Sequence, residues 1–243
     1  MRTASRKRAT LTTCAAVLTA AAVLTASDPG TAKDREALFE YLLRVTPART
    51  AWSPYTAGRP EQTFRAEAEK LRAEFVGADT DTKLYHALVK LSNIRHDRHL
   101  SVDIVEGGIQ PAEFDLRAPI LFRTDYGSGG AYELFVADFD TRISSLSGGG
   151  RPETGDVLIS VNGRPIDRHV RLMEPYIRYS TLNKLWWEIA AGVSRKTWQF
   201  GPEVYAGSTD AVFGLRRRSG AEYTLRVPYL TPDAVQWSGF AKK

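Results

Sequence analysis

The sequence predicts an α+β protein in which a small helical N-terminal subdomain precedes a partly open β-barrel that carries a helical insertion. Three observations lead to this fold class. Apolar residues recur at helical spacing between residues 34 and 94, they alternate from residue 100 onward, and turn residues bound a short apolar run at 155–166. With 243 residues, 43% of them hydrophobic, the chain can bury the core of one large or two modest domains.

The first 32 residues have the composition of a secretory signal peptide. A basic head precedes an uncharged run of small and apolar residues from Leu11 to Ala26, and Gly30-Thr31-Ala32 offers a small-residue cleavage site. The alternative is a membrane anchor, but the apolar run is shorter than the ~20 residues that a spanning helix needs. We therefore expect a secreted or extracytoplasmic protein with no stable membrane insertion after cleavage.

Charge and cysteine content narrow the class further. The chain has 33 basic and 28 acidic residues. Four basic residues and one acidic residue lie in the leader, so the mature protein has 29 basic and 27 acidic residues and a net charge of about +2. Such a balance does not indicate a nucleic-acid partner. Cys14 is the only cysteine and lies in the leader, so the mature protein is expected to have no disulfide.

Three amphipathic helices are predicted in the subdomain at residues 33–110. The first is capped by Asp34 and ends at Pro47, the second runs from Pro60 to Gly77, and the third opens at Asp79 or Thr80 and ends near Ile94. Alternation of Leu100, Val102 and Ile104 then predicts a short strand.

The rest of the chain alternates strand and helix patterns. Strands are predicted at 118–123, 132–137, 211–215 and 223–227, and helices at 168–179, with a kink at Pro175, and at 181–191. Residues 233–243 are too few for another domain and are interpreted as a C-terminal tail.

The run from Gly155 to Ile166 is the most specific local signal. Val157, Ile159 and Val161 alternate with Leu158 and Ser160, and Asn162-Gly163 is the dipeptide of a tight hairpin turn. This stretch resembles the Gly-Asp-x-Ile-x-x-Val-Asn-Gly signature of PDZ domains, which implies a PDZ-like domain over residues 111–232.

The four histidines are the first candidates for chemistry. His86 and His169 fall within predicted helices and are interpreted as partly exposed helical residues. His96 and His99 are three residues apart, a spacing that permits a shared metal, but the helix ends there and no further ligand is near. We predict no metal and no cofactor.

The segment from Leu88 to Val102 places Asp97-Arg98-His99 between a helix and a strand. It resembles the Leu-x-x-Leu-x-x-Leu-x-Asp-Gly-His-Thr/Ser segment of the tail-specific, or C-terminal-processing, serine proteases, whose relatives include tricorn core proteases and the chlamydial protease-like activity factor. The order of leader, helices, histidine and PDZ-like module is also similar from Asp34 to Leu230. Arg98 departs from the pattern, because the family usually has glycine there.

The resemblance implies two alternative roles for His99. In the chlamydial branch this histidine is the general base for a distant serine, and in other branches it is structural. Neither Ser128 nor Ser208 opens a helix after a strand, so neither has the setting of the catalytic serine. The chain is thus interpreted as the N-terminal part of such a peptidase, or a truncated relative, inactive alone.

PDZ-like modules bind extended peptides beside a sheet edge and hold the terminal carboxylate with amides of a glycine-rich loop. The groove is predicted between residues 119–123 and 168–179, so that peptide or unfolded-protein C-termini are the expected partners. The predicted peptide-binding residues are Ile120, Phe122, Tyr126, Gly127, Gly129, Gly130, Leu172 and Tyr176. Two alternatives remain: a module that only docks on a separate catalytic domain, and a stand-alone exported protein that binds peptides without cutting them.

Overall fold

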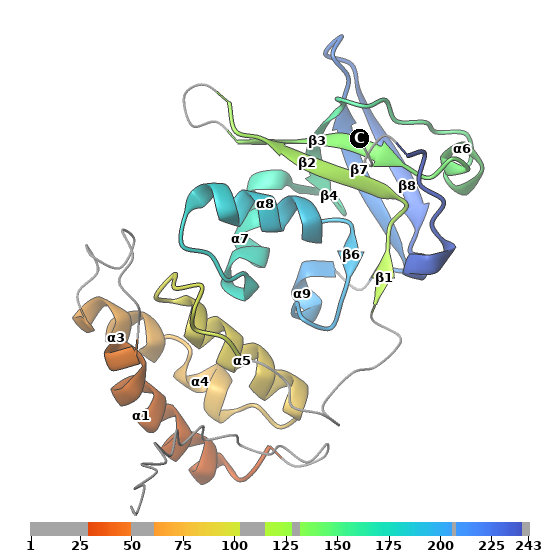
Figure 1. The fold of residues 1–243 in the computed structure, drawn as a ribbon. Helices are drawn as coiled ribbons and strands as arrows, with labels where there is room; N and C mark the ends of the chain where they lie inside the picture. Colours follow the sequence, from red (N-terminus) through yellow and green to blue (C-terminus); the bar gives the residue numbers. More distant parts are fainter. Residues whose placement is uncertain (1–28, 50–60, 103–114, 128–131, 206–207, 240–243) are drawn as a thin grey trace, which may run out of the picture.

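The computed structural model describes residues 29–49, 61–102, 115–127, 132–205 and 208–239. Two units follow one another along the chain (Figure 1). The helical unit comprises the helices between residues 32 and 93, and the β unit comprises the elements between residues 115 and 239. The predicted α+β class is confirmed, because the helices accompany a mostly antiparallel sheet that is not closed into a barrel.

Helix α1 (Ala32–Arg49) opens the helical unit. Thr31 caps it, since its hydroxyl accepts from the amide of Asp34 at 3.2 Å while the Asp34 carboxylate accepts from the amide of Thr31 at 2.9 Å. Asp34 is therefore the second member of a capping box rather than the cap. The helix also continues past Pro47 for two residues, where we expected it to stop.

The second predicted helix is two helices, α3 (Glu61–Glu69) and α4 (Arg72–Val76). The amide of Leu71 bonds the carbonyl of Ala68 at 2.9 Å, a tight turn that ends the first helix before the second begins. Helix α5 (Asp81–Asn93) follows, and Thr80 caps it by accepting from the amide of Lys83.

The sheet of the β unit is antiparallel, with strand order β2-β3-β4-β7-β8 and a short β5 beside β4. A separate two-stranded ribbon pairs β1 (Leu116–Arg117) with β6 (Arg195–Lys196). The strands of the main sheet are β2 (Ile120–Asp125), β3 (Glu133–Phe139), β4 (Val157–Val161), β5 (Arg164–Pro165), β7 (Asp210–Arg216) and β8 (Glu222–Pro228). Strand β2 is thus one edge of the sheet.

The hairpin predicted at Asn162-Gly163 is present between β4 and β5. Asn162 has a φ of 51° and Gly163 a φ of 75°, the left-handed pair that such a turn requires. The regular alternation predicted for β4 is not kept, because its pairing with β7 shifts between Leu158 and Ser160. As a result the buried side chains of β4 are Leu158 and Val161.

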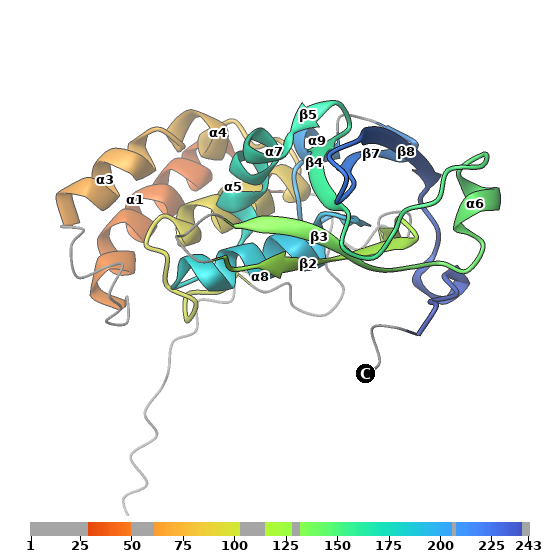
Figure 2. The ribbon, with the colours of Figure 1, turned by 90° about the horizontal axis from the view of Figure 1, so that it is seen from above.

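Helices cover the sheet on the side of the helical unit (Figure 2). Helix α8 (Leu182–Gly192) lies against β2, whereas α7 (Ile166–Met173) packs on β4 and continues into the short helix η2 (Glu174–Tyr176). The kink predicted at Pro175 falls within η2. The remaining short helices are α6 (Ile143–Leu146), α9 (Pro202–Tyr205) and η3 (Pro232–Ala234).

Each unit has its own hydrophobic core, and α5 contributes to both. Leu84, Ala87 and Leu91 of α5 face the core of the helical unit, while Tyr85 and Val89 face the core of the β unit. The two cores are therefore joined through the two faces of one helix. No helix in the described part of the chain is long and apolar enough to cross a membrane.

The strand predicted before the β unit needs correction, and the predicted C-terminal tail is hydrogen-bonded to the sheet. Residues 100–102 form no strand, and Ile104 lies outside the described residues. Residues 233–239, expected as a tail, pack on the end of β3: the amide of Gln236 donates to the Asp140 carboxylate at 2.7 Å, and the amide of Ser238 to the carbonyl of Phe139 at 3.2 Å. Non-local pairing of this kind leaves no periodic signal in the sequence.

Candidate functional site

The turn after α5 holds a carboxylate and an imidazole together. Asp97 is 1% exposed, and one oxygen of its carboxylate accepts from both the amide and the ring Nδ1 of His99, each at 2.9 Å. The His99 side chain is 80% exposed. A neutral imidazole that donates from Nδ1 presents the lone pair of Nε2 on the opposite side of the ring. The turn therefore displays an oriented basic nitrogen at the surface.

Local bonds on both sides fix the conformation of this turn. The amide of His96 donates to the carbonyl of Asn93 at 2.9 Å, and the amide of Leu100 donates to the carbonyl of Asp97 at 3.1 Å. The His96 ring packs on Tyr179 with 4.5 Å between ring centroids, and the amide of Arg98 donates to the Ser180 hydroxyl at 3.2 Å. The β unit thus braces the turn that carries His99.

Arg98 fits this turn without the glycine of the protease pattern. Among the described residues, His96 and Asn162 are the non-glycine residues with positive φ, and Arg98 is not one of them. The left-handed conformation of the turn is therefore adopted two residues before Arg98. An L-residue is accommodated at Arg98 without backbone strain.

The other histidines have structural settings. His86 and His169 are 6% and 2% exposed, so the prediction of partly exposed residues is wrong for both. His86 Nε2 lies 2.8 Å from the carbonyl of Trp198, and burial lowers the His86 pKa. Burial also lowers the His169 pKa, to about 4. The described residues contain no group of three His, Cys, Asp or Glu side chains that could hold a metal.

The predicted peptide-binding residues are distributed over different environments. Ile120 and Phe122 are buried in the core of the β unit, where Phe122 meets Phe213 with 5.2 Å between ring centroids. A peptide beside β2 would therefore meet the backbone of these two residues rather than their side chains. Tyr126 and Gly127 are exposed just beyond β2, and the amide of Gly127 already donates to the Asp125 carboxylate at 3.0 Å.

Leu172 and Tyr176 belong to elements that pack on β4 and on α5, respectively. Leu172 is half-buried on α7 and Tyr176 is buried in η2, where its hydroxyl donates to Glu203. The helix beside β2 is α8, so the segment 168–179 does not form the far wall of a groove there. Gly129 and Gly130 lie outside the described residues. Peptide binding by these residues stays a prediction.

Asp97 was recognised in the sequence as part of the Asp97-Arg98-His99 segment, without a role of its own. The signal was the Asp-x-His spacing, because a carboxylate two residues before a histidine at a helix end can accept from both its amide and its ring nitrogen. Of the serines considered earlier, Ser128 is outside the described residues, and the hydroxyl of Ser208 donates to the carbonyl of Tyr205 at 2.8 Å.

Known proteins similar to this chain are found by comparing structures and not by comparing sequences. No family model and no curated protein sequence matches it. Mature CPAF, the chlamydial protease-like activity factor, has a TM-score of 0.51 and 14% sequence identity, with 82% of this chain and 34% of CPAF covered. A serine-to-alanine mutant of CPAF gives a TM-score of 0.51 and 13% identity, over 86% of this chain and 35% of that one. The photosystem II D1 C-terminal processing protease gives a TM-score of 0.33, with 16% identity over 81% of this chain and 44% of that protein.

The likeness to CPAF shows a shared fold. At 13–14% identity it carries no further property from one chain to the other. This chain spans about a third of the length of the CPAF structures that it matches. The prediction of a fold like that of CPAF is confirmed for the described residues.

Proposed function

We propose that the chain is the recognition and proton-transfer part of an exported serine peptidase related to the tail-specific proteases, with the reactive serine on another polypeptide segment. The observation that carries this proposal is the buried Asp97 carboxylate on Nδ1 of an exposed His99. The fold shared with CPAF supports it. Export through residues 1–32 and a PDZ-like domain at 111–232 belong to the same proposal.

The chemistry needs an oriented base because a serine hydroxyl is a weak nucleophile at neutral pH. In the proposed reaction, Nε2 of His99 accepts the serine proton as the serine oxygen bonds to the substrate carbonyl carbon. Asp97 stabilises the imidazolium that forms. His99 then gives the proton to the leaving amine when the peptide C–N bond breaks, and a water molecule repeats the sequence to release the acid.

The test is a peptidase assay on this chain co-expressed with the polypeptide encoded directly after Lys243. We expect hydrolysis of fluorogenic peptides, and His99→Ala should lower kcat by about 10³-fold or more with little change in KM. Asp97→Asn should lower kcat by at least about tenfold, because the imidazole loses its fixed orientation. Ser101→Ala, an exposed change in the same segment, is the control.

Two results would count against the peptidase. One is a turnover that His99→Ala leaves unchanged. The other is an unrelated gene after Lys243, together with no hydrolysis by any co-purifying serine enzyme. Circular dichroism of each variant separates loss of chemistry from loss of fold.

A stand-alone peptide-binding protein is the second candidate, and the position of β2 favours it. Within the described residues, β2 pairs with β3 on one side and α8 lies beside it, an arrangement that suits addition of an extended peptide. Calorimetry with peptides that carry free or amidated C-termini, in the absence of hydrolysis, distinguishes this function from the first.

A further inference from the structure

A cavity of about 410 Å³ lies where the helical unit meets the β unit. Its walls come from five places: α5, the segment 98–102, the segment 176–178, the end of α8 with Arg195, and the segment 197–200. A volume of this size is within the range of ~300–1,000 Å³ that small-ligand sites occupy. Neither the proposed proton transfer nor peptide addition at β2 makes use of it.

One part of the wall is aromatic. Tyr85, Tyr176, Trp198 and Phe200 all line the cavity. Their rings are already packed on one another, with 4.9 Å between the centroids of Tyr85 and Trp198 and 6.0 Å between those of Tyr176 and Phe200. A ligand body that contacts this wall therefore meets apolar side chains whose positions are fixed before it arrives.

The other part of the wall is cationic. Arg98, Arg178 and Arg195 line the cavity together with one acid, Glu188. Glu188 is paired with Lys184 at 2.7 Å, and Arg195 lies 3.2 Å from Asp115, whose side chain is 59% exposed. The guanidinium groups of Arg98 and Arg178 have no ion-pair partner among the residues that the structure describes. The cavity therefore has an excess of positive charge.

We propose that this cavity binds a carboxylate that carries an apolar body, with the carboxylate on Arg98 and Arg178 and the body against the aromatic wall. Guanidinium groups match the planar, two-oxygen geometry of a carboxylate and bind it through paired hydrogen bonds. Two sources share this chemistry: a free aromatic acid, and the last residue of a peptide. The inference depends on the cavity alone. A failed test of ligand binding would therefore leave the proposed role of His99 unaffected, and a failed test of His99 would leave the cavity proposal unaffected.

Calorimetry on the full chain with three probes tests the inference. N-acetyl-phenylalanine has both the charge and the ring, its amide has only the ring, and acetate has only the charge. We expect the acid to bind at least about tenfold more tightly than either of the others, because a charge-assisted hydrogen bond and apolar burial each contribute. Equal binding of the acid and its amide would overturn the proposal.

Variants then locate the site. The double variant Arg98→Gln and Arg178→Gln should weaken binding of the acid by about tenfold or more. The control is the double variant Arg168→Gln and Arg226→Gln, which removes the same charge from exposed positions elsewhere and should leave binding of the acid unchanged. Ala191→Trp fills the cavity while keeping every arginine and should also abolish binding. Binding that survives both the arginine pair and Ala191→Trp contradicts the proposal.

A peptide that ends in phenylalanine distinguishes the two sources. If the peptide binds as tightly as the free acid and loses affinity in the same arginine variants, the cavity accepts a chain terminus. If only the free acid binds, the ligand is a small molecule. Both results support the proposed site, and peptide binding that the arginine variants leave unchanged belongs to the edge of β2 instead.

Discussion

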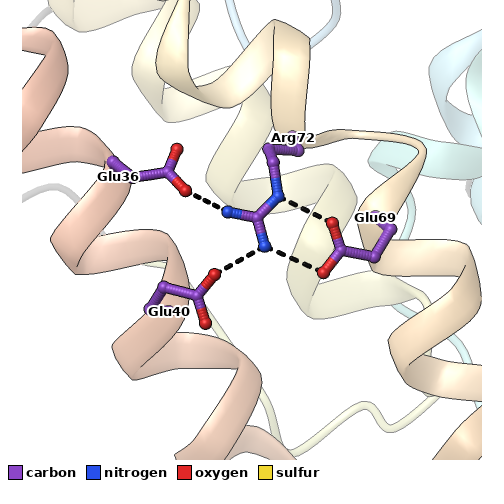
Figure 3. Close-up of polar contacts among 4 residues, drawn as sticks. All are labelled: Glu36, Glu40, Glu69 and Arg72. Carbon is purple, nitrogen blue, oxygen red and sulfur yellow. Dashed lines mark hydrogen bonds and ion pairs between the residues drawn. The ribbon is translucent and has the colours of Figure 1, made fainter.

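The two units of this protein differ in how many carboxylates they bury. In the helical unit the main charged cluster is at the surface, where Arg72 contacts Glu36 and Glu40 of α1 and Glu69 of α3 (Figure 3). In the β unit three carboxylates are buried, since Asp138, Asp140 and Asp156 are at most 2% exposed. The helical unit buries one carboxylate, that of Asp81 in α5 at 6% exposed, so the β unit depends more on specific polar partners inside.

Those partners come from distant parts of the chain. Asp140 accepts from the amide of Gln236, and Asp156 accepts from the hydroxyl of Tyr223 at 2.5 Å. Burial by itself raises the Asp140 pKa, but hydrogen bonds from Arg142 and from the amide of Gln236 outweigh it and hold this pKa below its usual range. A buried carboxylate with such partners ties the last described residues to β3.

Removal of a core phenylalanine from each unit should have the largest effect and test whether the units unfold separately. Phe213→Ala in the β unit and Phe39→Ala in the helical unit each delete a ring that is 0% exposed, which costs about 3–5 kcal/mol. Four of the five tryptophans, Trp186, Trp187, Trp198 and Trp237, lie in the β unit. Tryptophan fluorescence during urea unfolding should therefore report mainly Phe213→Ala.

The circular dichroism signal at 222 nm is the second probe of urea unfolding, because the helices of the helical unit also contribute to it. Phe39→Ala should shift the dichroism transition to lower urea and leave the fluorescence transition nearly in place. If both probes shift together in both variants, the shared helix α5 couples the units into one cooperative transition.

Stability should also depend on pH, and in the β unit His169 should account for part of this dependence. Burial and, to a smaller extent, the charge of Arg164 lower the pKa of His169 in α7 to about 4, below the value of about 6.5 in an unfolded chain. Between these values the unfolded chain binds a proton that the folded one does not, so stability is complete above about pH 6.5 and falls toward pH 4. We expect a loss of about 2–3 kcal/mol in fluorescence-detected unfolding over that range.

His169→Leu should flatten this slope in the β unit. In the helical unit, hydrogen bonds from Arg72 and Lys83 lower the pKa of the exposed carboxylates of Glu69 and Asp79, respectively. Depressed carboxylates lose their contribution only as pH falls below about 4. A fluorescence slope between pH 6.5 and 4 that is the same in His169→Leu as in the parent would contradict the role of His169.

Features that depend on neighbouring residues could be predicted from the sequence. Thr80, the apolar face of α5 and the Asn162-Gly163 turn are local signals, and the structure confirms each of them. The shift in β4 could not be predicted, because it depends on a partner fifty-four residues away: a side chain at Gly214 would come within 2.2 Å of the Ser160 hydroxyl. Docking of Gln236 on Asp140 is non-local in the same way.

The same distinction between local and non-local features applies to the candidate site. The Asp97–His99 contact spans two residues and follows from spacing, so the sequence could place it. The cavity could not be anticipated, because Arg98, Arg178 and Arg195 lie far apart in the chain and meet only after both units fold. The helix beside β2 could not be identified for a related reason: α7 and α8 are both amphipathic, and only the tertiary structure shows that α8 lies beside β2.

The smallest effect is expected at the surface cluster of the helical unit. Arg72→Met keeps an apolar stem near the Phe39 ring, over which the guanidinium now lies at 4.6 Å, but it leaves three glutamates close together without their cation. We expect a loss of about 1–2 kcal/mol in dichroism-detected unfolding, and less in 0.5 M NaCl, because exposed pairs are weak singly and are screened by salt.

Arg217→Met in the β unit is the matched control for Arg72→Met. Arg217 also lies over an aromatic ring, at 4.7 Å from the centroid of Tyr223, but it pairs with one glutamate, Glu153, and so should cost less than about 0.5 kcal/mol. Equal losses for the two arginines would mean that the three-glutamate cluster adds nothing beyond a single ion pair. A larger loss for Arg72 that shrinks in salt would show that surface charge stabilises the helical unit, whereas buried carboxylates organise the β unit.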